Sequence, residues 1–209
     1  MKIIVLADER GKEEFISKKI SAGVEVSYIN NLSGITSTTS SSFADAFFIL
    51  KETNIEDNKI FGEKPVFINA VTHTLKEMNL PENFTRINGW PTFVKRDIWE
   101  IASSNENFAK EIFEKLQWKY LKVADDPGFV SARIISMIIN EAYFALGENV
   151  SSKDEIDVAM KLGTNYPYGP FEWCKKIGIQ KVYDLLEKLS ETDNRYNIAP
   201  AMKNELTTE

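Results

Sequence analysis

The sequence predicts an α/β domain over residues 1–123, followed by an all-α domain over residues 124–209. In the first part, short apolar runs typical of strands alternate with segments of helical apolar spacing, which is the pattern of a doubly wound parallel sheet. In the second part the apolar segments have helical spacing only. The Asp-Asp-Pro-Gly sequence at residues 125–128 interrupts both kinds of regular structure, so the boundary is expected at 123–126.

Five strands and two helices are expected in the first domain. The strands lie at residues 2–7, 24–29, 44–52, 64–70 and 84–89. At residues 11–23 and 105–118, apolar side chains recur every three or four positions, as in an amphipathic helix. The Ser/Thr-rich segment 31–42 has few side chains to bury and is predicted to be a loop. The order of elements fits a doubly wound sheet, but the domain is small, so we expect a truncated version.

The helix expected after Asp125 has apolar residues on more than one face. This distribution predicts that neighbouring helices surround it. Two shorter helices are expected near residues 170–177 and 179–190, and the tail at 197–209 is expected to fray.

Another helix is expected at residues 151–163, because both of its ends are marked in the sequence. Ser151 or Ser152 can cap its first turn, and the acidic residues that follow favour the positive end of the helix. Gly163 can end it.

The composition excludes several classes of function. The formal net charge is −6 and the basic residues form no cluster, so we expect no nucleic-acid partner. Cys174 is the only cysteine and His73 the only histidine, which leaves no intrachain disulfide and no ordinary zinc site. The N-terminal run MKIIVLADE is too short for a membrane helix and lacks the pattern of a signal peptide. A cytoplasmic protein without membrane contact is expected.

Four blocks of the C-terminal half resemble the helical domain of the 3-hydroxyacyl-CoA dehydrogenases. They are DDPGFVSARI at residues 125–134, NEA at 140–142, SSKDEIDVAMKLG at 151–163 and YPYGPFEW at 166–173. That family typically has D-x-P-G-F-(V/I)-x-N-R, then N-E-A, D-I-D-x-A-M-(K/R)-x-G and P-x-G-P-(F/L)-E in the same order and at similar spacing. The likeness continues more weakly towards the N-terminus and covers most of the chain.

The resemblance implies both a fold and a reaction. The fold is a Rossmann-like NAD-binding domain, truncated here, followed by a helical domain that dimerises. The reaction, part of fatty acid metabolism, is the reversible NAD-dependent oxidation of a 3-hydroxyacyl-CoA to the 3-ketoacyl-CoA.

The cofactor positions differ from those of the family. A Rossmann domain needs G-x-G-x-x-G after its first strand, so that the backbone can approach the pyrophosphate. Here Ala7, Glu9 and Lys12 stand at the glycine positions, and Asp8 adds a second negative side chain beside Glu9. Asn30 replaces the acid that binds the ribose. These positions are therefore degenerate, and we expect no cofactor, or NAD if the family activity survives.

The substrate clamp of the family is also missing. A helical hairpin that helps to hold CoA follows the second strand in the relatives, whereas here only the Ser/Thr-rich segment lies between Asn30 and the next strand. A shorter acyl chain or another small molecule remains a candidate ligand.

The catalytic base of the family is a His in the segment H-F-F-N-P-V-P, and a Glu twelve residues later orients it. If the Asn and second Pro of that segment are matched to Asn88 and Pro91, Thr85 stands at the His position and Asp97 at the Glu position. Threonine cannot accept a hydroxyl proton near neutral pH, which imidazole can do. Glu100 would replace the acid only if the register slips by three residues.

The supporting positions are changed as well. Where the family has N-T-S-S, Asn69 is kept, Val71 replaces the first serine and Thr72 keeps a hydroxyl at the second. His73 is either a relocated base or a surface residue. Ala132 stands where the family has an Asn near the reacting carbons.

The residues that match the family are mainly those that build helix breaks, caps and a dimer core. Among them, Asp157 and Glu172 are predicted to be structural partners of Arg133 or of backbone amides.

Two hypotheses follow. The first is a divergent relative without dehydrogenase activity, a pseudoenzyme that acts as an interaction or small-ligand-binding protein and forms a homodimer through the helical domain. The second is an active enzyme on an acyl-CoA or a related hydroxy acid, with Thr72, His73, Asp97 or Glu100 in substitute roles. The sequence leaves the ligand open, and also whether the chain pairs with a full-length paralogue.

Overall fold

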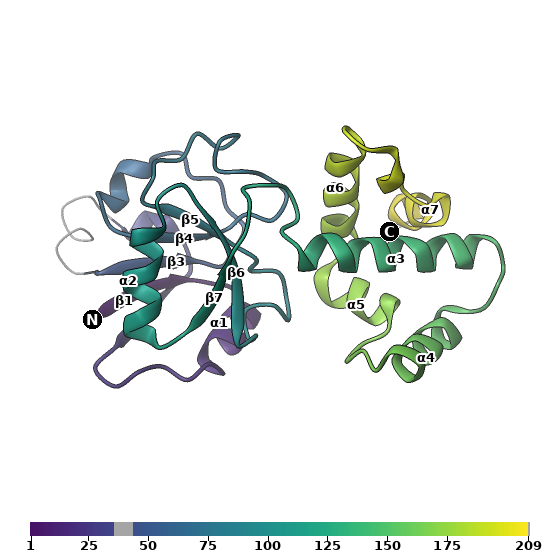
Figure 1. Cartoon of the computed structure of the whole chain (residues 1–209), viewed down its shortest axis with the longest axis horizontal. Coiled ribbons are helices and arrows are strands. Elements are labelled where there is room, and N and C mark those ends of the chain that lie inside the picture. The colour runs from purple at the N-terminus through teal and green to yellow at the C-terminus, as the bar shows by residue number, and fades with distance from the viewer. Residues whose placement is uncertain (36–43, 209) are drawn as a thin grey trace. The chain divides into compact units, whose positions relative to one another are not determined.

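The computed structural model describes residues 1–35 and 44–208. The chain divides into two compact units, Met1–Phe129 and Val130–Glu209 (Figure 1). The boundary predicted at 123–126 precedes this division by a few residues. Most of the loop predicted at 31–42 lies outside the described residues. None of the described helices has the length and apolarity that a membrane-crossing helix needs.

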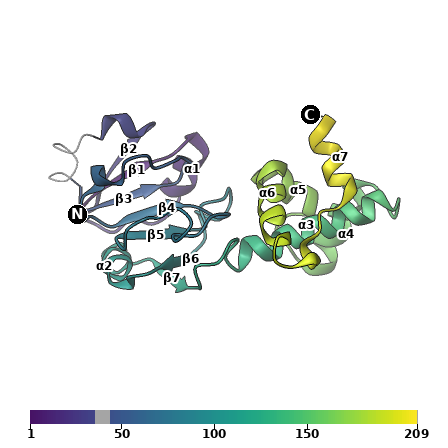
Figure 2. The same ribbon diagram turned by 90° about the horizontal axis from the view of Figure 1, so that it is seen from above.

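The N-terminal unit is built on one seven-stranded sheet. Its strands are β1 (Lys2–Leu6), β2 (Glu25–Ile29), β3 (Ala46–Ile49), β4 (Val66–Asn69), β5 (Phe84–Ile87), β6 (Ile98–Ser103) and β7 (Lys119–Lys122). They lie side by side in the order β2-β1-β3-β4-β5-β6-β7 (Figure 2). The first five are parallel, β6 runs antiparallel to β5, and β7 is parallel to β6. The predicted α/β class is confirmed.

Two helices, α1 (Glu9–Ile16) and α2 (Glu106–Leu116), cover the same face of this sheet. Their apolar residues join a core rich in aromatic rings, in which Phe48 stacks on Phe67 with ring centroids 4.5 Å apart. The opposite face is covered by irregular segments and by two 3-10 turns, η1 (Leu32–Gly34) and η2 (Asn58–Phe61). The fold is thus a reduced version of the doubly wound arrangement, as its size predicted.

The helix predicted at 11–23 is shorter than expected, because α1 ends at Ile16. The following segment bonds to other parts of the sheet domain. The indole Nε1 of Trp118 donates to the carbonyl of Lys19 at 2.8 Å, and the ammonium of Lys18 donates to the carbonyl of Arg96 at 2.6 Å. These tertiary contacts replace a further turn of helix.

The C-terminal unit is all α-helical. It contains α3 (Ser131–Gly147), α4 (Lys153–Thr164), α5 (Pro170–Ile177), α6 (Ile179–Ser190), η3 (Asn194–Tyr196) and α7 (Pro200–Thr208). As predicted from its apolar residues, α3 is surrounded, and it packs against α5, α6 and α7 (Figure 1).

The start of α4 was predicted and its end was not. Ser152 caps the helix in a reciprocal capping box with Glu155. At the other end the helix continues through Gly163, and Asn165, with φ of 55° in the left-handed region, caps it instead.

The prediction that the tail frays is wrong, because residues 200–208 form α7 and dock on α3. The buried amide of Asn140 donates to the carbonyl of Asn197 and accepts from the backbone N–H of Ala199, both at 2.9 Å. Met202 is fully buried. A buried amide with two backbone partners fixes the chain just before the helix, and this contact over more than fifty residues has no local sequence signal.

Candidate functional site

The carboxyl ends of the parallel strands are the edge at which doubly wound sheets bind their ligands. Asn69, at the end of β4, connects three strands there. Its Nδ2 donates to the carbonyl of Leu50 at 3.0 Å, and its Oδ1 accepts from the backbone N–H of Gly89 at 3.0 Å. A Cβ on Gly89 would lie 2.7 Å from Asn69. The retained Asn69 therefore has a structural role at this edge.

The turn between β1 and α1 contains the degenerate cofactor positions. Ala7 is buried, whereas Asp8 and Glu9 are exposed. Asp8 is the N-cap of α1, and its Oδ1 accepts from the backbone N–H of Gly11 at 2.7 Å. A carboxylate of the protein itself therefore occupies the positive end of the helix, where a Rossmann domain holds the pyrophosphate.

Asn30 lies exposed just after β2, beside a hollow of about 430 Å³ at the carboxyl ends of β1, β2 and β3. The hollow has both polar and apolar lining residues, among them Asn30, Asn31, Leu32, Lys51, Asp57 and Ile60. Its volume is within the range of small-molecule sites, and its position is the edge of the sheet that binds ligands in this class of fold.

The structure does not bring Thr85 and Asp97 together. The buried Thr85 is opposite Ser103 in the β5–β6 pair and donates from Oγ1 to the hydroxyl of Ser103 at 3.2 Å. Asp97 is exposed just before β6, six residues from Ser103, which corresponds to about 20 Å along a strand. The structure therefore does not form the Thr85–Asp97 pair that the anchors Asn88 and Pro91 predict.

The register shifted by three residues is the one that the strands support. Asn88 follows β5, and its backbone N–H donates to the carbonyl of Glu100 in β6 at 3.4 Å. These two residues are twelve positions apart, as are the His and Glu of the family, and they lie at the carboxyl end of β5. Asn88 is 7% exposed, and its Oδ1 accepts from the backbone N–H of Trp90 at 3.3 Å. In this register an amide stands where the family has its base, and an amide cannot act as a base.

The strand pattern contained the signal for this pair. If the apolar run of β5 ends at Ile87, the polar residue at its carboxyl end is Asn88, and a count of twelve leads to Glu100. Residues 89–97 form a loop, so a matching Pro there constrains the register less than the end of a strand does.

The other candidates follow one another in the turn after β4 and differ in exposure. Val71 is buried, and its carbonyl accepts from the backbone N–H of Gly128 at 2.7 Å. Thr72 is half-buried and His73 is exposed, as expected for a surface histidine.

Arg86 in β5 is fully buried and connects this turn to the end of the sheet unit. Its Nη1 lies 2.5 Å from Oδ1 of Asp125, and its Nε donates to the carbonyl of Ala70 at 2.8 Å. The guanidinium also stands 4.7 Å from the ring centroid of Phe129. Burial lowers the pKa of Arg86, and the hydrogen bond and charge of Asp125 oppose that effect. An arginine held by so many partners orders the backbone and does not transfer protons.

In the helical unit, the matching residues serve the scaffold. Ala132 is fully buried in α3 and offers no hydrogen bond. Asp157 accepts from the backbone N–H groups of Phe171 and Glu172 at 2.8 and 3.0 Å, so it caps α5. Burial raises the pKa of Asp157, and these two hydrogen bonds oppose it. Glu172 pairs with Lys161 at 2.5 Å. The prediction that both carboxylates are structural is supported, with backbone amides as the partners of Asp157.

The described residues contain no cluster of metal ligands, and the turn at the cofactor edge differs from that of the family. Over residues 1–35 and 44–208, no three His, Cys, Asp or Glu side chains gather as metal ligands. At the cofactor edge, the turn after β1 lacks the glycines that allow a pyrophosphate to approach and contains two carboxylates, Asp8 and Glu9.

Comparisons with known proteins agree with this architecture. Residues 128–208 match the family model of the 3-hydroxyacyl-CoA dehydrogenase C-terminal domain. The chain is 51% identical over 69 residues to the 3-hydroxyadipyl-CoA dehydrogenase of Escherichia coli, a match that covers 33% of this chain and 14% of that protein. It is 30% identical over 141 residues to the 3-hydroxybutyryl-CoA dehydrogenase of Bradyrhizobium diazoefficiens, covering 64% of this chain and 48% of the relative.

A solved structure resembles the whole chain in its fold. The (S)-3-hydroxybutyryl-CoA dehydrogenase of Ralstonia eutropha superimposes with a TM-score of 0.71 at 17% identity, and the match covers 99% of this chain and 93% of that one.

The matched segments span about half of these curated relatives or less. The likeness is high in the helical unit and lower over the sheet, where the β1–α1 turn and the end of β5 carry changed residues. Residues 128–208 therefore form a domain of the 3-hydroxyacyl-CoA dehydrogenase C-terminal type, and the whole chain shares the two-part fold of these proteins.

Proposed function

We propose that this protein is a family member without NAD-dependent dehydrogenase activity. It forms a homodimer through its helical unit and acts in the cytoplasm as an interaction or small-ligand-binding protein. The observation that carries the proposal is the contact between Asp8 and Gly11 at the start of α1.

This contact opposes NAD binding in two ways. The backbone N–H of Gly11 already donates to Asp8, so a phosphate would have to displace an internal cap. A phosphate 4 Å from Asp8 or Glu9 would also be repelled by about 1 to 4 kcal/mol for each charge pair. The members of this family use NAD, whose pyrophosphate is negatively charged. The β1–α1 turn of this chain also carries negative side chains and so repels such a group.

The end of β5 supports the same conclusion. Oxidation of a 3-hydroxyl group needs an acceptor for its proton, and the family uses imidazole. Asn88 occupies that position here and is engaged with the backbone of Trp90. One observation favours an active enzyme. Glu100 is opposite Asn88, so the carboxylate of the family's His–Glu pair is retained in this register.

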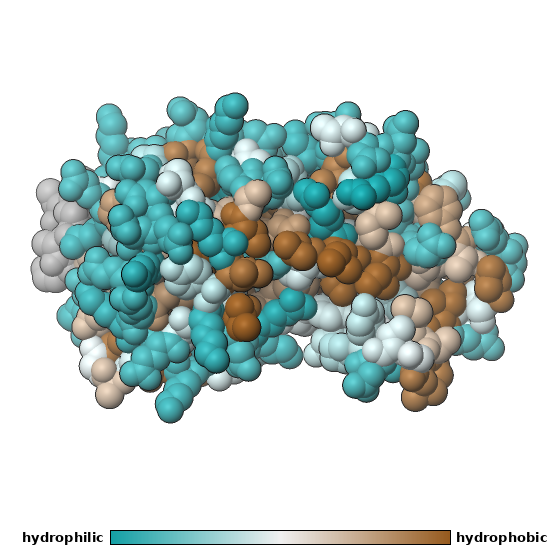
Figure 3. All heavy atoms as spheres, viewed as in Figure 1, coloured by the Kyte–Doolittle hydropathy of each residue, from teal (hydrophilic) through white to brown (hydrophobic). Residues whose placement is uncertain are grey.

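The dimer is supported by an exposed apolar stripe on α3. Ile134, Met137 and Ile138 are spaced three and four residues apart, and Ile134 is 53% exposed. They line a hollow of about 470 Å³ in the helical unit. Figure 3 shows hydrophobic side chains gathered along this helix. A second copy of the chain, placing the same stripe against this one, would remove both stripes from water.

The proposed lack of dehydrogenase activity is tested on the purified chain with NADH and acetoacetyl-CoA. We expect no change in nicotinamide fluorescence or melting temperature with NADH, and no oxidation of NADH when acetoacetyl-CoA is added. Far-UV circular dichroism controls for folding, because the sample should show the helical content of helices α1 to α7. Micromolar NADH binding with turnover would overturn the proposal. A rise in melting temperature with acetoacetyl-CoA alone would support a ligand-binding role.

A further inference from the structure

We infer that the N-terminal unit contains a binding site for a small organic polyanion, with two or more phosphate or carboxylate groups, on the sheet face that α1 and α2 cover. The site is a hollow of about 440 Å³. It is distinct from the Asn88–Glu100 pair and from the β1–α1 turn, so it does not depend on whether the chain binds NAD.

Three segments that are distant in sequence form this hollow. They are the end of α1 with the residues after it, the loop before β6, and the junction of α2 with β7. The lining residues are Ser17, Lys18, Lys19, Ser21, Lys95, Asp97, Leu116, Gln117, Trp118 and Lys119. Four of them are lysines and one is an acid, whereas the whole chain has a formal net charge of −6. A positive hollow on an acidic protein concentrates anions locally.

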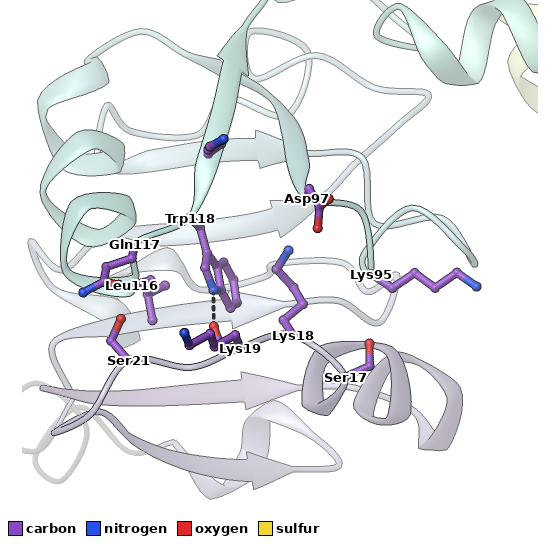
Figure 4. A pocket seen from close by; sticks show the side chains of 10 residues that line it. Ser17, Lys18, Lys19, Ser21, Lys95, Asp97, Leu116, Gln117 and Trp118 are labelled. Carbon is purple, nitrogen blue, oxygen red and sulfur yellow. Dashed lines mark hydrogen bonds between the residues drawn. The ribbon is translucent and has the colours of Figure 1, made fainter.

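Lys18 lies in the centre of the hollow on an aromatic floor. Its ammonium is 4.6 Å from the ring centroid of Trp118 and 5.3 Å from that of Trp99. Figure 4 shows its side chain between Trp118 and Asp97. Burial lowers the pKa of Lys18, and the charge of Asp97 opposes this effect. A bound anion would give this partly desolvated cation a closer counter-charge.

The walls of the hollow are held in place. Trp118 is 9% exposed and its Nε1 donates to the carbonyl of Lys19 at 2.8 Å. The loop before β6 is bonded to α1 and to the residues after it. Glu14 in α1 accepts from the backbone N–H of Thr92 at 2.7 Å, and Lys18 after α1 donates to the carbonyl of Arg96. Thr92 has φ of 80°, a conformation that a non-glycine residue adopts only when its surroundings hold it. The exposed ammonium groups of Lys19 and Lys119 are thus presented from fixed backbone.

The volume favours a small ligand over a macromolecule. A hollow of this size is near the lower end of the range for small-molecule sites. Asp97 limits the net charge and favours a ligand that also carries a hydrogen-bond donor, such as a hydroxyl group, next to its anionic groups.

Calorimetric titration of the full chain with inorganic pyrophosphate and with citrate tests this site. Lys19→Gln combined with Lys119→Gln should weaken binding about tenfold or more, because each lost ammonium removes a charge-assisted hydrogen bond. Asp97→Asn should strengthen the binding of pyrophosphate, because a repulsive charge is removed and this probe has no alcohol group to donate to Asp97. The control is Lys59→Gln combined with Lys203→Gln, which makes the same charge change at exposed positions outside the hollow.

Tighter binding of pyrophosphate would identify phosphate as the recognised group, and tighter binding of citrate would identify carboxylate. No heat with either probe would overturn the site, and so would an equal loss of binding in the control variant. An unchanged affinity in the Asp97→Asn protein would also contradict it. None of these results depends on NADH or acetoacetyl-CoA, so this proposal and the proposed lack of dehydrogenase activity can fail separately.

Discussion

The guanidinium of Arg86 and the carboxylate of Asp125 lie 2.5 Å apart, and Arg86 is fully buried. Asp125 also accepts from the backbone N–H of Leu75 at 2.9 Å. This pair therefore ties β5, the turn after β4 and the segment that leaves β7 into one structure. It explains why Asp-Asp-Pro-Gly, which reads as a break in the sequence, is an ordered part of the sheet unit.

Arg86→Met should lower the free energy of unfolding of the sheet unit by about 3 to 5 kcal/mol, because several buried acceptors lose their donor. Asp125→Asn should cost less, since the amide can still accept a hydrogen bond. Denaturant unfolding followed by tryptophan fluorescence would measure both, since Trp90, Trp99 and Trp118 lie in this unit. In the double variant the two losses should not add, because both substitutions remove the same contact. Additive losses would contradict a direct interaction.

Asp8→Ala should destabilise the chain by about 1 kcal/mol, because the N-cap of α1 is lost. Glu13→Ala, an exposed position in the same helix, is the matched control and should have little effect. Thermal unfolding of the two variants provides the comparison. Equal melting temperatures would show that Asp8 is not a cap, and the main argument against a bound pyrophosphate would lose its structural basis.

Gly169→Ala should be strongly destabilising, because a Cβ there would overlap Asp157 and displace the caps of α5. Gly163→Ala is the matched control in the same unit. Apart from its chain neighbours and the backbone of its own helix, no atom lies within 4 Å of a Cβ at position 163. Alanine in this helical position should therefore stabilise the chain by about 0.5 to 1 kcal/mol. Thermal unfolding of both variants, followed by circular dichroism, measures these two changes in stability, which should have opposite signs. A loss of stability in both would mean that glycine is needed for another reason.

The capping box of α4 should contribute to stability in a pH-dependent way. Hydrogen bonds from Ser151 and Ser152 lower the pKa of Glu155 to about 2, from an ordinary value of 4.5. A lowered pKa of an acid means that the folded state favours the charged form. The contribution is therefore complete above pH 4.5 and is lost as the pH falls from 4.5 towards 2.

Melting temperatures of the wild type and of Glu155→Gln would be compared over this range. The difference between them should shrink as the pH falls, because only the wild type loses a charged acceptor. Glu148→Gln, at an exposed glutamate outside the box, should show no such trend. A constant difference between wild type and Glu155→Gln would refute the role of the charge.

Ile134→Glu should convert the proposed homodimer into a monomer, because it places a charge in the middle of the apolar stripe on α3. Light scattering coupled to size-exclusion chromatography gives the mass directly. Val150→Glu is the control, since Val150 is 68% exposed and lies beyond the end of α3. A wild-type mass of 23.8 kDa, that of one chain, would contradict the dimer.

Local patterns in the sequence predicted much of the secondary structure. The five parallel strands, the long apolar α3, and the capped starts of α4 and α5 follow from hydrophobic spacing and from Ser, Gly and Pro at helix starts. These signals act over a few residues, so they can be recognised without knowledge of the fold. The short strands β6 and β7 were not predicted individually, because Ile98–Ser103 and Lys119–Lys122 become strands by pairing with neighbours.

The candidate site was predicted less well. The replacement of the family's glycines and of its histidine at the matched positions is visible in the sequence, because a motif that lacks its residues can be recognised without a structure. Which residues took their places was not visible. The β5–β6 register decides that Asn88, and not Thr85, is opposite Glu100.

The sequence by itself determined the resemblance to the family, the division into a sheet unit and a helical unit, and the replacement of the histidine in the family's H-F-F-N-P-V-P segment. Only the tertiary structure decided that Asp8 caps its own helix, that the tail docks on α3, and that Lys18, Lys19, Lys95 and Lys119 meet in one hollow. The physical reason is that caps and packing across the sheet join residues far apart in the chain, and the free energy of such contacts depends on geometry that no local pattern contains.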